Sequence, residues 1–312
     1  MLLLAKKIKN IFSSKILLFF AIFLFTITIF VIEIIANHRY VSKNLTKSIQ
    51  TSEKKVGEML KSSQQALMDI IADVESKPFN HRKLEQTIQR ARGIRFQFNK
   101  IPWTEFSWID SRNNIVVDSK LGVVSSNNTI NLSNRDYVQK ALKDPYKIQI
   151  GAVVIGSTSF KRMIPFGIAT QKNGKYSGAI VLGIEIKKMT EIIKETLPKN
   201  CTILLLGVGN EFLLSSDEDL SENKLNKTQF LEKLIKLKSS GKTSSKIEFT
   251  KLNGYEVAIK LSDKYPFTFV AIYNNSSHDN NFLLKHSVKI KILILIALSI
   301  ILIILTARFN KY

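Results

Sequence analysis

The hydrophobic pattern begins with a long uninterrupted apolar segment near the amino terminus. Residues 16–36, ILLFFAIFLFTITIFVIEIIA, contain Glu33 as their single charge. About 20 apolar residues are enough to cross a bilayer as a helix. A cleaved signal peptide has a shorter apolar core and a small-residue cleavage site, which is missing before Asn37. We therefore expect residues 16–37 to be an uncleaved transmembrane helix, with the lysine-rich residues 1–15 in the cytoplasm.

A second apolar segment lies near the carboxyl terminus. Residues 292–307, ILILIALSIILIILTA, become long enough for a span when residues 288–291 are added. Two spans place the tail, residues 308–312, on the cytoplasmic side with the first 15 residues. Residues 38–287 would then lie outside the cytoplasm, so nucleic acid is not expected as a partner.

Between the two apolar segments, the pattern is first helical. From position 45 to position 74, apolar or small residues recur at steps near three and four, which is typical of one face of a helix. Such a stalk from Arg39 to Ser76 would be roughly 55 Å long and would end before Pro78. A second helix, His81 to Arg92, is predicted to stop at Gly93, which completes a helical region over residues 38–93. The apolar face either packs on its own domain or forms a homodimer seam of the coiled-coil type.

After Gly93 the period changes to that of strands, in two successive units. The first, residues 94–198, has a predicted hairpin (103–109 and 115–118), a helix at 135–143, strands at 148–155, 162–171 and 178–186, and a helix at 187–196. Asn173-Gly174 is expected to form the turn between the last two strands. The second unit, residues 199–283, has predicted strands at 202–206, 211–215, 245–250, 255–261 and 267–273, and a helix at 226–238. The sequence therefore predicts an α+β protein with two tandem antiparallel-sheet subdomains, a long stalk helix and two flanking transmembrane helices.

Composition removes several classes of function. The formal net charge is +21, from 46 Lys+Arg and 25 Asp+Glu, and we interpret most of this charge as solvated lysine-rich surface. A single cysteine, Cys201, excludes a disulfide framework and is expected to be a buried thiol. The sequence shows no phosphate-binding loop, metal-ligand cluster or nucleophile–base spacing. Neither an enzyme nor a cofactor is therefore expected.

Four segments, taken in order, resemble the double Cache sensor domains of bacterial receptors, also described as extracytoplasmic PAS-like domains. They are WIDSRNNIVVDS (108–119), INLSNRDYVQKAL (130–142), RMIPFGIATQKNGKYSGAIVLGIEI (162–186) and KLSDKYPFTFVAIYN (260–274). The similarity covers about residues 38–280. It implies a pocket for a small extracytoplasmic ligand and a location in the bacterial cytoplasmic (inner) membrane, with the main domain on the periplasmic side.

Six residues are candidates for binding that ligand. Arg135 and Tyr137 match the Arg-x-Tyr start of the family's helix, and an arginine fork suits a carboxylate. Phe106 and Trp108 alternate on the first strand, where they line the pocket or belong to the core. Arg162 begins a central strand. By the same resemblance, Glu185 stands at the position where the amino-acid-binding members have an Asp that holds the ligand's amine.

The helix-start motif departs in part from that of the amino-acid-binding members, which is Tyr-x-Arg-x-Trp-Tyr. Ser133 stands at the first Tyr, Tyr137 at the Trp and Val138 at the second Tyr. An amino acid, an organic acid and an amine all stay open as ligands.

The expected function is that of a membrane-bound sensor. Because the sequence ends five residues after Ala307, we expect a receptor input domain without its own output domain. It would be a truncated or split histidine kinase, diguanylate cyclase or chemoreceptor, or a sensor subunit that acts on a separate signalling partner. The alternative is a non-sensory envelope scaffold or anchor protein with a basic outer domain.

Overall fold

The computed structural model describes residues 2–75, 80–98, 102–125, 127, 129–172, 175–207, 211–217, 232, 246–252 and 255–274. The chain divides into two compact units, one made of residues 1–44 with 274–312 and the other of residues 45–273. The predicted second span, the Asn173-Gly174 turn and the predicted helix at 226–238 lie outside the described residues, apart from Glu232.

The first element, α1, is a helix over Leu2–Glu75. In its first part, bulky apolar side chains are exposed: Leu24, Phe25, Ile27, Phe30, Val31, Ile32, Ile34 and Ile35. From Leu24 on, α1 is the one helix among the described residues that is long and apolar enough to cross a membrane, with a mean hydropathy of 1.4 in its most apolar window. A signal sequence would meet the same criterion, so a membrane span at this segment stays a prediction.

From Leu45 on, α1 belongs to the second unit and buries one face. Its buried apolar side chains recur at helical spacing: Leu45, Ile49, Val56, Met59, Leu60, Leu67, Ile70 and Ile71. Ser48, Ser52 and Ser63 lie fully buried on the same face. The predicted stripe is therefore a packing face within this unit, while its use in a dimer stays a prediction.

Helix α2 spans His81–Phe98 and so passes through Gly93. The predicted stop at this glycine is wrong. A glycine inside a helix costs about 1 kcal/mol relative to alanine. This cost alone is too small to end a helix unless a proline or further glycines follow. The next proline is Pro102, which lies just after the helix.

The first sheet is antiparallel and has the strand order β3-β2-β1-β7-β6-β4, with β5 also paired to β6. Its strands are β1 (Trp103–Asp110), β2 (Ile115–Asp118), β3 (Gly122–Val123), β4 (Gln149–Ile150), β5 (Val154–Ile155), β6 (Arg162–Lys172) and β7 (Lys175–Glu185). The predicted hairpin is confirmed as the antiparallel pair β1–β2. Its turn is held by Asp110 Oδ1, which accepts hydrogen bonds from the backbone N–H groups of Arg112 and Asn114, each at 2.9 Å.

The prediction of one strand over 148–155 is wrong, because β4 and β5 are separate short strands. Gly151 lies between them in a tight position. A Cβ atom there would lie 2.8 Å from Tyr137 Cβ and 2.9 Å from Pro165 Cγ. The chain here passes close to β6 and to the helix that precedes β4. The Gly151 N–H still donates to the Pro165 carbonyl oxygen at 3.0 Å, and the chain leaves β6 after this residue until β5 begins.

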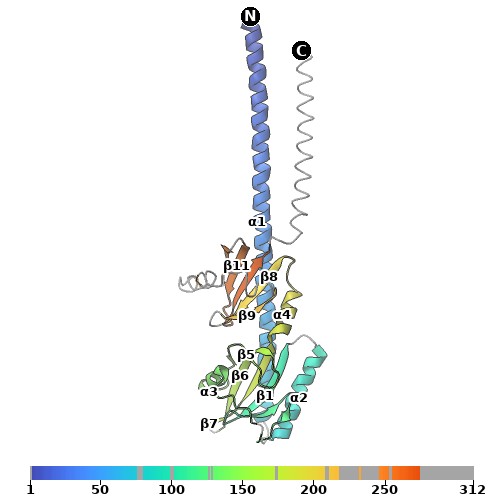
Figure 1. The fold of residues 1–312 in the computed structure, drawn as a ribbon, viewed down its shortest axis with the longest axis vertical. Coiled ribbons are helices and arrows are strands. Elements are labelled where there is room, and N and C mark those ends of the chain that lie inside the picture. The colour runs from blue at the N-terminus through green and yellow to red at the C-terminus, as the bar shows by residue number, and fades with distance from the viewer. Residues whose placement is uncertain are drawn as a thin grey trace. The chain divides into compact units, whose positions relative to one another are not determined.

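The two faces of the first sheet carry different partners. Along β1, Phe106 and Trp108 lie on one face, while Ser107 and Ile109 lie on the other. The second face is covered by α3 (Asp136–Lys143), whose Tyr137 packs with Ile109. Helix α2 lies beside β1, β2 and β3, and α3 lies beside β6 (Figure 1). The cluster under α3 comprises Ile109, Ile115, Leu132, Tyr137, Val138, Ala141, Ala169, Ala179 and Val181.

Helix α4 (Ile186–Lys194) follows β7 directly and leads to the second sheet. This sheet has the order β10-β11-β12-β8-β9 and is also antiparallel. Its strands are β8 (Cys201–Leu206), β9 (Phe212–Ser215), β10 (Glu248–Leu252), β11 (Tyr255–Leu261) and β12 (Thr268–Tyr273). They match the predicted strands to within a few residues, and Cys201 is buried as predicted. The predicted α+β architecture with two antiparallel sheets and a long amino-terminal helix is therefore confirmed.

Candidate functional site

Arg135 and Tyr137 lie at the start of α3, on the covered face of the first sheet. Arg135 is the residue before the first turn, with extended backbone angles (φ −83°, ψ 128°). Its Nη2 donates to the carbonyl oxygen of Ile155 over 3.5 Å. Tyr137 is only 2% exposed, and its ring lies over Gly167, where a Cβ atom would be 3.3 Å from Tyr137 Cδ2. The helix start therefore fixes one guanidinium at the edge of the sheet and one phenol beneath it.

The electrostatics of Tyr137 show which charges surround its hydroxyl. Burial raises the pKa of Tyr137 most strongly, the positive charge of Arg135 lowers it, and the negative charges of Glu105 and Asp136 raise it further. The phenol thus lies within electrostatic reach of both a guanidinium and the buried carboxyl group of Glu105. This pairing of charges on one face of the sheet is the arrangement that a zwitterionic or bifunctional ligand requires.

Glu105 and Asp118 are two buried acids that the sequence predictions missed. Glu105 is 3% exposed and Asp118 is fully buried. Ser107 Oγ donates to Asp118 Oδ2 at 2.6 Å and Thr158 Oγ1 donates to the same oxygen at 3.2 Å. The backbone N–H of Ser159 donates to Glu105 Oε2 at 3.1 Å. Both acids therefore hold the same loop, residues 156–161, against the sheet.

The pair is electrostatically unfavourable. Burial and, next, the charge of Asp118 raise the pKa of Glu105, while hydrogen bonds from Ser159 and Thr158 lower it. No ion pair reaches either carboxylate within the described part of the chain. Alternation along β1 places Glu105 on the face opposite Phe106. The signal that could have found it was an acid inside the predicted strand 103–109, between Trp103 and Phe106.

Phe106 and Trp108 lie on the other face of the sheet, so the structure does not bring them to Arg135 and Tyr137. Phe106 packs edge-to-face against Trp103, with ring centroids 5.2 Å apart. The indole nitrogen of Trp103 in turn donates to Ser63 Oγ of α1 at 2.7 Å. Trp103 and Phe106 therefore belong to the core between the sheet and α1, and Trp108 is buried on the same face of β1. A place in the core is the second of the two roles that the sequence left open.

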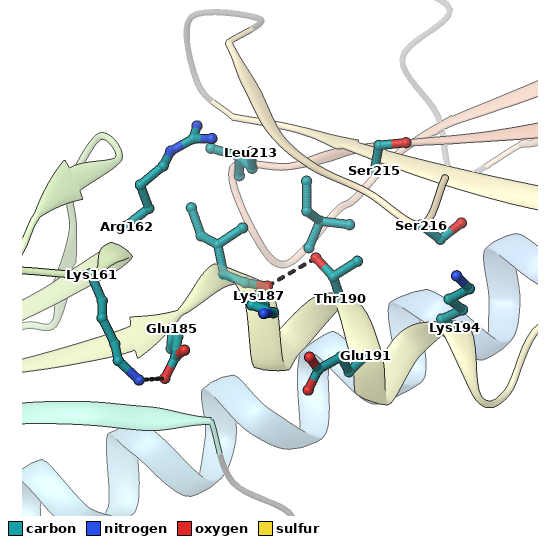
Figure 2. A pocket seen from close by; sticks show the side chains of 12 residues that line it. Lys161, Arg162, Glu185, Lys187, Thr190, Glu191, Lys194, Leu213, Ser215 and Ser216 are labelled. Atoms are coloured by element: carbon teal, nitrogen blue, oxygen red, sulfur yellow. Dashed lines mark hydrogen bonds and ion pairs between the residues drawn. The ribbon is translucent and has the colours of Figure 1, made fainter. Parts of the chain in front are cut away.

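Arg162 and Glu185, the last two candidates, line a cleft of about 620 Å³. Figure 2 shows Arg162 extending from the start of β6 toward Leu213 of β9, while Glu185 pairs with Lys161 on the opposite side. The Lys161 Nζ to Glu185 Oε2 distance is 2.8 Å, and Lys188 Nζ lies 3.7 Å from the same oxygen. We define the cation cleft as the twelve residues that line this cavity: Lys161, Arg162, Glu185, Ile186, Lys187, Thr190, Glu191, Lys194, Leu213, Leu214, Ser215 and Ser216. The structure thus divides the predicted site residues among three places.

A metal site in the described residues would need a group of side chains that could bind the ion. No group of three or more His, Cys, Asp or Glu side chains there could hold a metal ion. The thiol of Cys201 is buried, and burial raises its pKa despite a hydrogen bond with Ser48.

Comparison with known proteins gives matches of structure only. No protein-family model and no curated protein matches the chain. The sensory domain of the Campylobacter jejuni chemoreceptor Tlp3 with isoleucine bound matches with a TM-score of 0.56 at 15% identity, covering 76% of this chain and 94% of that domain. The extracellular domain of rpHK1S-Z16, described as a histidine kinase, matches with a TM-score of 0.60 at 14% identity, covering 80% and 98%. The ligand-binding domain of Mlp24 with asparagine matches with a TM-score of 0.55 at 11% identity, covering 77% and 94%.

These structures define the class of fold. The chain has the double Cache, PAS-like fold of extracellular ligand-binding sensor domains, as found in chemoreceptors and in a receptor described as a histidine kinase. The matched parts of these proteins are sensor domains and not catalytic domains. The fold expected from the four sequence segments is thereby confirmed.

Proposed function

We propose that this protein is a membrane-anchored sensor whose extracytoplasmic domain binds a small molecule. The observation that carries the proposal is the grouping of Arg135, Tyr137 and the buried Glu105–Asp118 pair on one face of a sheet with the sensor fold. A guanidinium suits a carboxylate and the two acids suit an amine. The ligand class is therefore an amino acid, an organic acid or an amine.

The site has the features of a recognition site. Its polar groups converge from β1, β2, the start of α3 and the loop at 156–161, while apolar side chains surround them. Small-molecule sites combine an apolar lining with a few placed polar groups in this way. A ligand amine that replaced the hydrogen bonds of Thr158 or Ser159 would also supply the positive charge that the two buried acids lack.

A route for the signal starts at β1. Glu105 faces the proposed ligand, and Trp103, two residues earlier on the same strand, is hydrogen-bonded to Ser63 of α1. Ligand binding shifts the population of α1 arrangements only if the ligand prefers one of them. The apolar part of α1 is proposed to anchor the chain in the cytoplasmic membrane of a bacterium, where a homodimer or a separate signalling partner would receive the change.

The test is thermal unfolding of the full-length protein in detergent micelles against a panel of amino acids, carboxylic acids and amines. A ligand that binds only the folded state stabilises it by about 2.7 kcal/mol at one hundred times its dissociation constant. We expect a stabilising ligand whose effect is lost in Arg135→Gln or Glu105→Gln.

The matched control is Arg112→Gln, since Arg112 is an exposed arginine in the β1–β2 turn. The control variant should respond like the wild type. A panel without any stabilising ligand would count against a sensor and favour an envelope scaffold or anchor. A ligand whose effect survives in Arg135→Gln and in Glu105→Gln would remove these residues from the site.

A further inference from the structure

The cation cleft holds more positive charge than its own acids neutralise. Glu185 is the better neutralised of its two acids, because Lys161 and Lys188 both approach its Oε2. The side chains of Arg162, Lys187 and Lys194 make no hydrogen bond or ion pair with any described residue, and Glu191 is the one other acid in the lining. Three exposed cations therefore face a shared cavity with a single remaining carboxylate to offset them.

The hydroxyl groups of the cation cleft differ in what they can still offer. Thr190 Oγ1 donates to the carbonyl oxygen of Ile186 at 2.9 Å, so its hydroxyl proton cannot be donated to a ligand at the same time. Ser216 Oγ accepts from the backbone N–H of Ile203 at 2.9 Å, so its own proton has no acceptor among the described residues. Ser216 is therefore a hydrogen-bond donor available on the side of β9, across the cleft from α4.

The start of α4 adds a further group of donors. Glu185 precedes the first turn of this helix but makes no side-chain cap to its N–H groups. The first N–H groups of a helix lack partners within the helix and carry partial positive charge. Lys187 lies in this first turn, so a side-chain cation and the uncapped end of the helix are close together at the cleft.

We propose that the cation cleft is a second binding site, separate from the one on the α3 face, and that it takes a small oxyanion, either a polycarboxylate or a phosphate. Arg162 supplies the planar fork that pairs with two oxygens of one group. Lys187 supplies a second cation, and Ser216 supplies a neutral donor at the far end of the cleft, beside Lys194 (Figure 2). The apolar side chains of Leu213, Leu214 and Ile186 limit the access of water, and a cavity of about 620 Å³ has room for a molecule of this size.

The position of the site gives such an anion a stabilising effect. Arg162 begins β6 of the first sheet and lies beside Leu213 of β9, whereas Ser216, directly after β9, lies beside Lys194 at the other end of the cleft (Figure 2). An anion that bridges Arg162 to the cations of α4 makes contacts that only the folded protein offers. It therefore raises the stability of the folded protein.

The test uses the full-length protein in detergent micelles with sodium citrate or sodium phosphate, compared with sodium chloride at matched ionic strength. We expect citrate or phosphate to raise the unfolding midpoint in a saturable manner that chloride does not reproduce. The apparent dissociation constant should rise at least tenfold in Arg162→Gln and also rise in Lys187→Gln. Arg112→Gln, which removes an exposed arginine outside the cleft, should behave like the wild type.

A saturable effect of citrate alone would identify the ligand as a polycarboxylate, and one of phosphate alone would identify it as a phosphate. No saturable effect of either anion, or an equal effect in wild type and Arg162→Gln, would overturn the proposal. Because Arg162 is exposed, its variant is expected to unfold at the wild-type temperature in chloride, and that measurement checks its folding. Arg135→Gln should keep the anion effect, so failure of the α3-face site and failure of the cation cleft give different results.

Discussion

Trp103 and Ser63, forty positions apart in the sequence, form a buried hydrogen bond between the first sheet and α1, with 2.7 Å between the indole nitrogen and Ser63 Oγ. Ser63 Oγ also donates to the carbonyl oxygen of Met59 at 2.8 Å, so its proton is directed along the helix and its lone pair toward the indole. Both side chains are buried. The serine thus has a fixed orientation that suits one partner on β1.

Ser63→Ala should lower the free energy of unfolding by about 1–3 kcal/mol, because it leaves the buried indole N–H without an acceptor. Thermal or denaturant unfolding of the full-length protein measures this loss. Ser62→Ala is the matched control, since Ser62 is the neighbouring, partly exposed serine of the same helix. Equal stability of the two variants would show that the hydrogen bond contributes nothing net.

Glu105 predicts a decrease of stability with rising pH. Its pKa in the folded protein is raised by burial and by Asp118, so the folded state binds more protons than the unfolded state above the ordinary glutamic acid value of about 4.3. The stabilisation is complete below that value and is lost as the pH rises through the raised pKa. The ionisable groups that face Glu105 are Asp118 of β2 and Tyr137 of α3.

Unfolding curves between pH 4 and pH 8 measure this dependence. Glu105→Gln should remove the decrease, whereas Glu75→Gln, at an exposed position on α1, should retain it. A wild-type protein whose stability does not fall across this interval, or falls equally in Glu105→Gln, would show that Glu105 is not the group responsible.

Two glycines should respond in opposite directions to the same substitution. Gly178 on β7 has φ +152°, and a Cβ atom there would lie 2.5 Å from the carbonyl oxygen of Ile109. Gly178→Ala should therefore destabilise the protein by about 1–3 kcal/mol.

At Gly57 on α1 the nearest atom would be Tyr265 Cε2 at 3.5 Å, an ordinary contact. Gly57→Ala should stabilise the helix by about 0.5–1 kcal/mol. Unfolding midpoints decide both signs.

The ion pair between Lys260 of β11 and Glu53 of α1 should be energetically coupled. The two side chains are only 15% and 23% exposed. A double-mutant cycle with Lys260→Met and Glu53→Gln should give a coupling free energy above about 1 kcal/mol. The comparison pair is Lys251 with Glu256, in which the lysine is 73% exposed and the coupling should be about 0–1 kcal/mol. Equal couplings would mean that Lys260 does not tie the second sheet to α1.

Much of the fold could be predicted from the sequence because its signals are local. The alternation of FSWID and IVVDS around a polar turn predicts the β1–β2 hairpin, and the apolar face of α1 recurs at helical spacing. The end of α2 could not be read from Gly93, since one glycine is a weak helix breaker. The break at Gly151 depends on Pro165 and Tyr137, which lie far from it in the sequence.

The site was harder to predict for the same reason. Alternation correctly placed Phe106 and Trp108 on one face of β1, but the sequence does not show which face α1 covers. The pairing of Glu105 with Asp118 depends on strand register and on the loop at 156–161. Arg162 and Glu185 were recognised as candidates, whereas the cation cleft that they share needs β9 of the second sheet.

The contacts of α1 have a consequence for biosynthesis. Glu53 meets Lys260 across 207 positions of sequence, and Gly57 lies against Tyr265. The buried face of α1 is therefore synthesised long before the strands that cover it. The apolar stripe of this helix therefore stays exposed to water until the last strands of its domain are made. Contacts between residues so far apart in the sequence slow folding, and the exposed stripe makes the unfinished chain a substrate for chaperones.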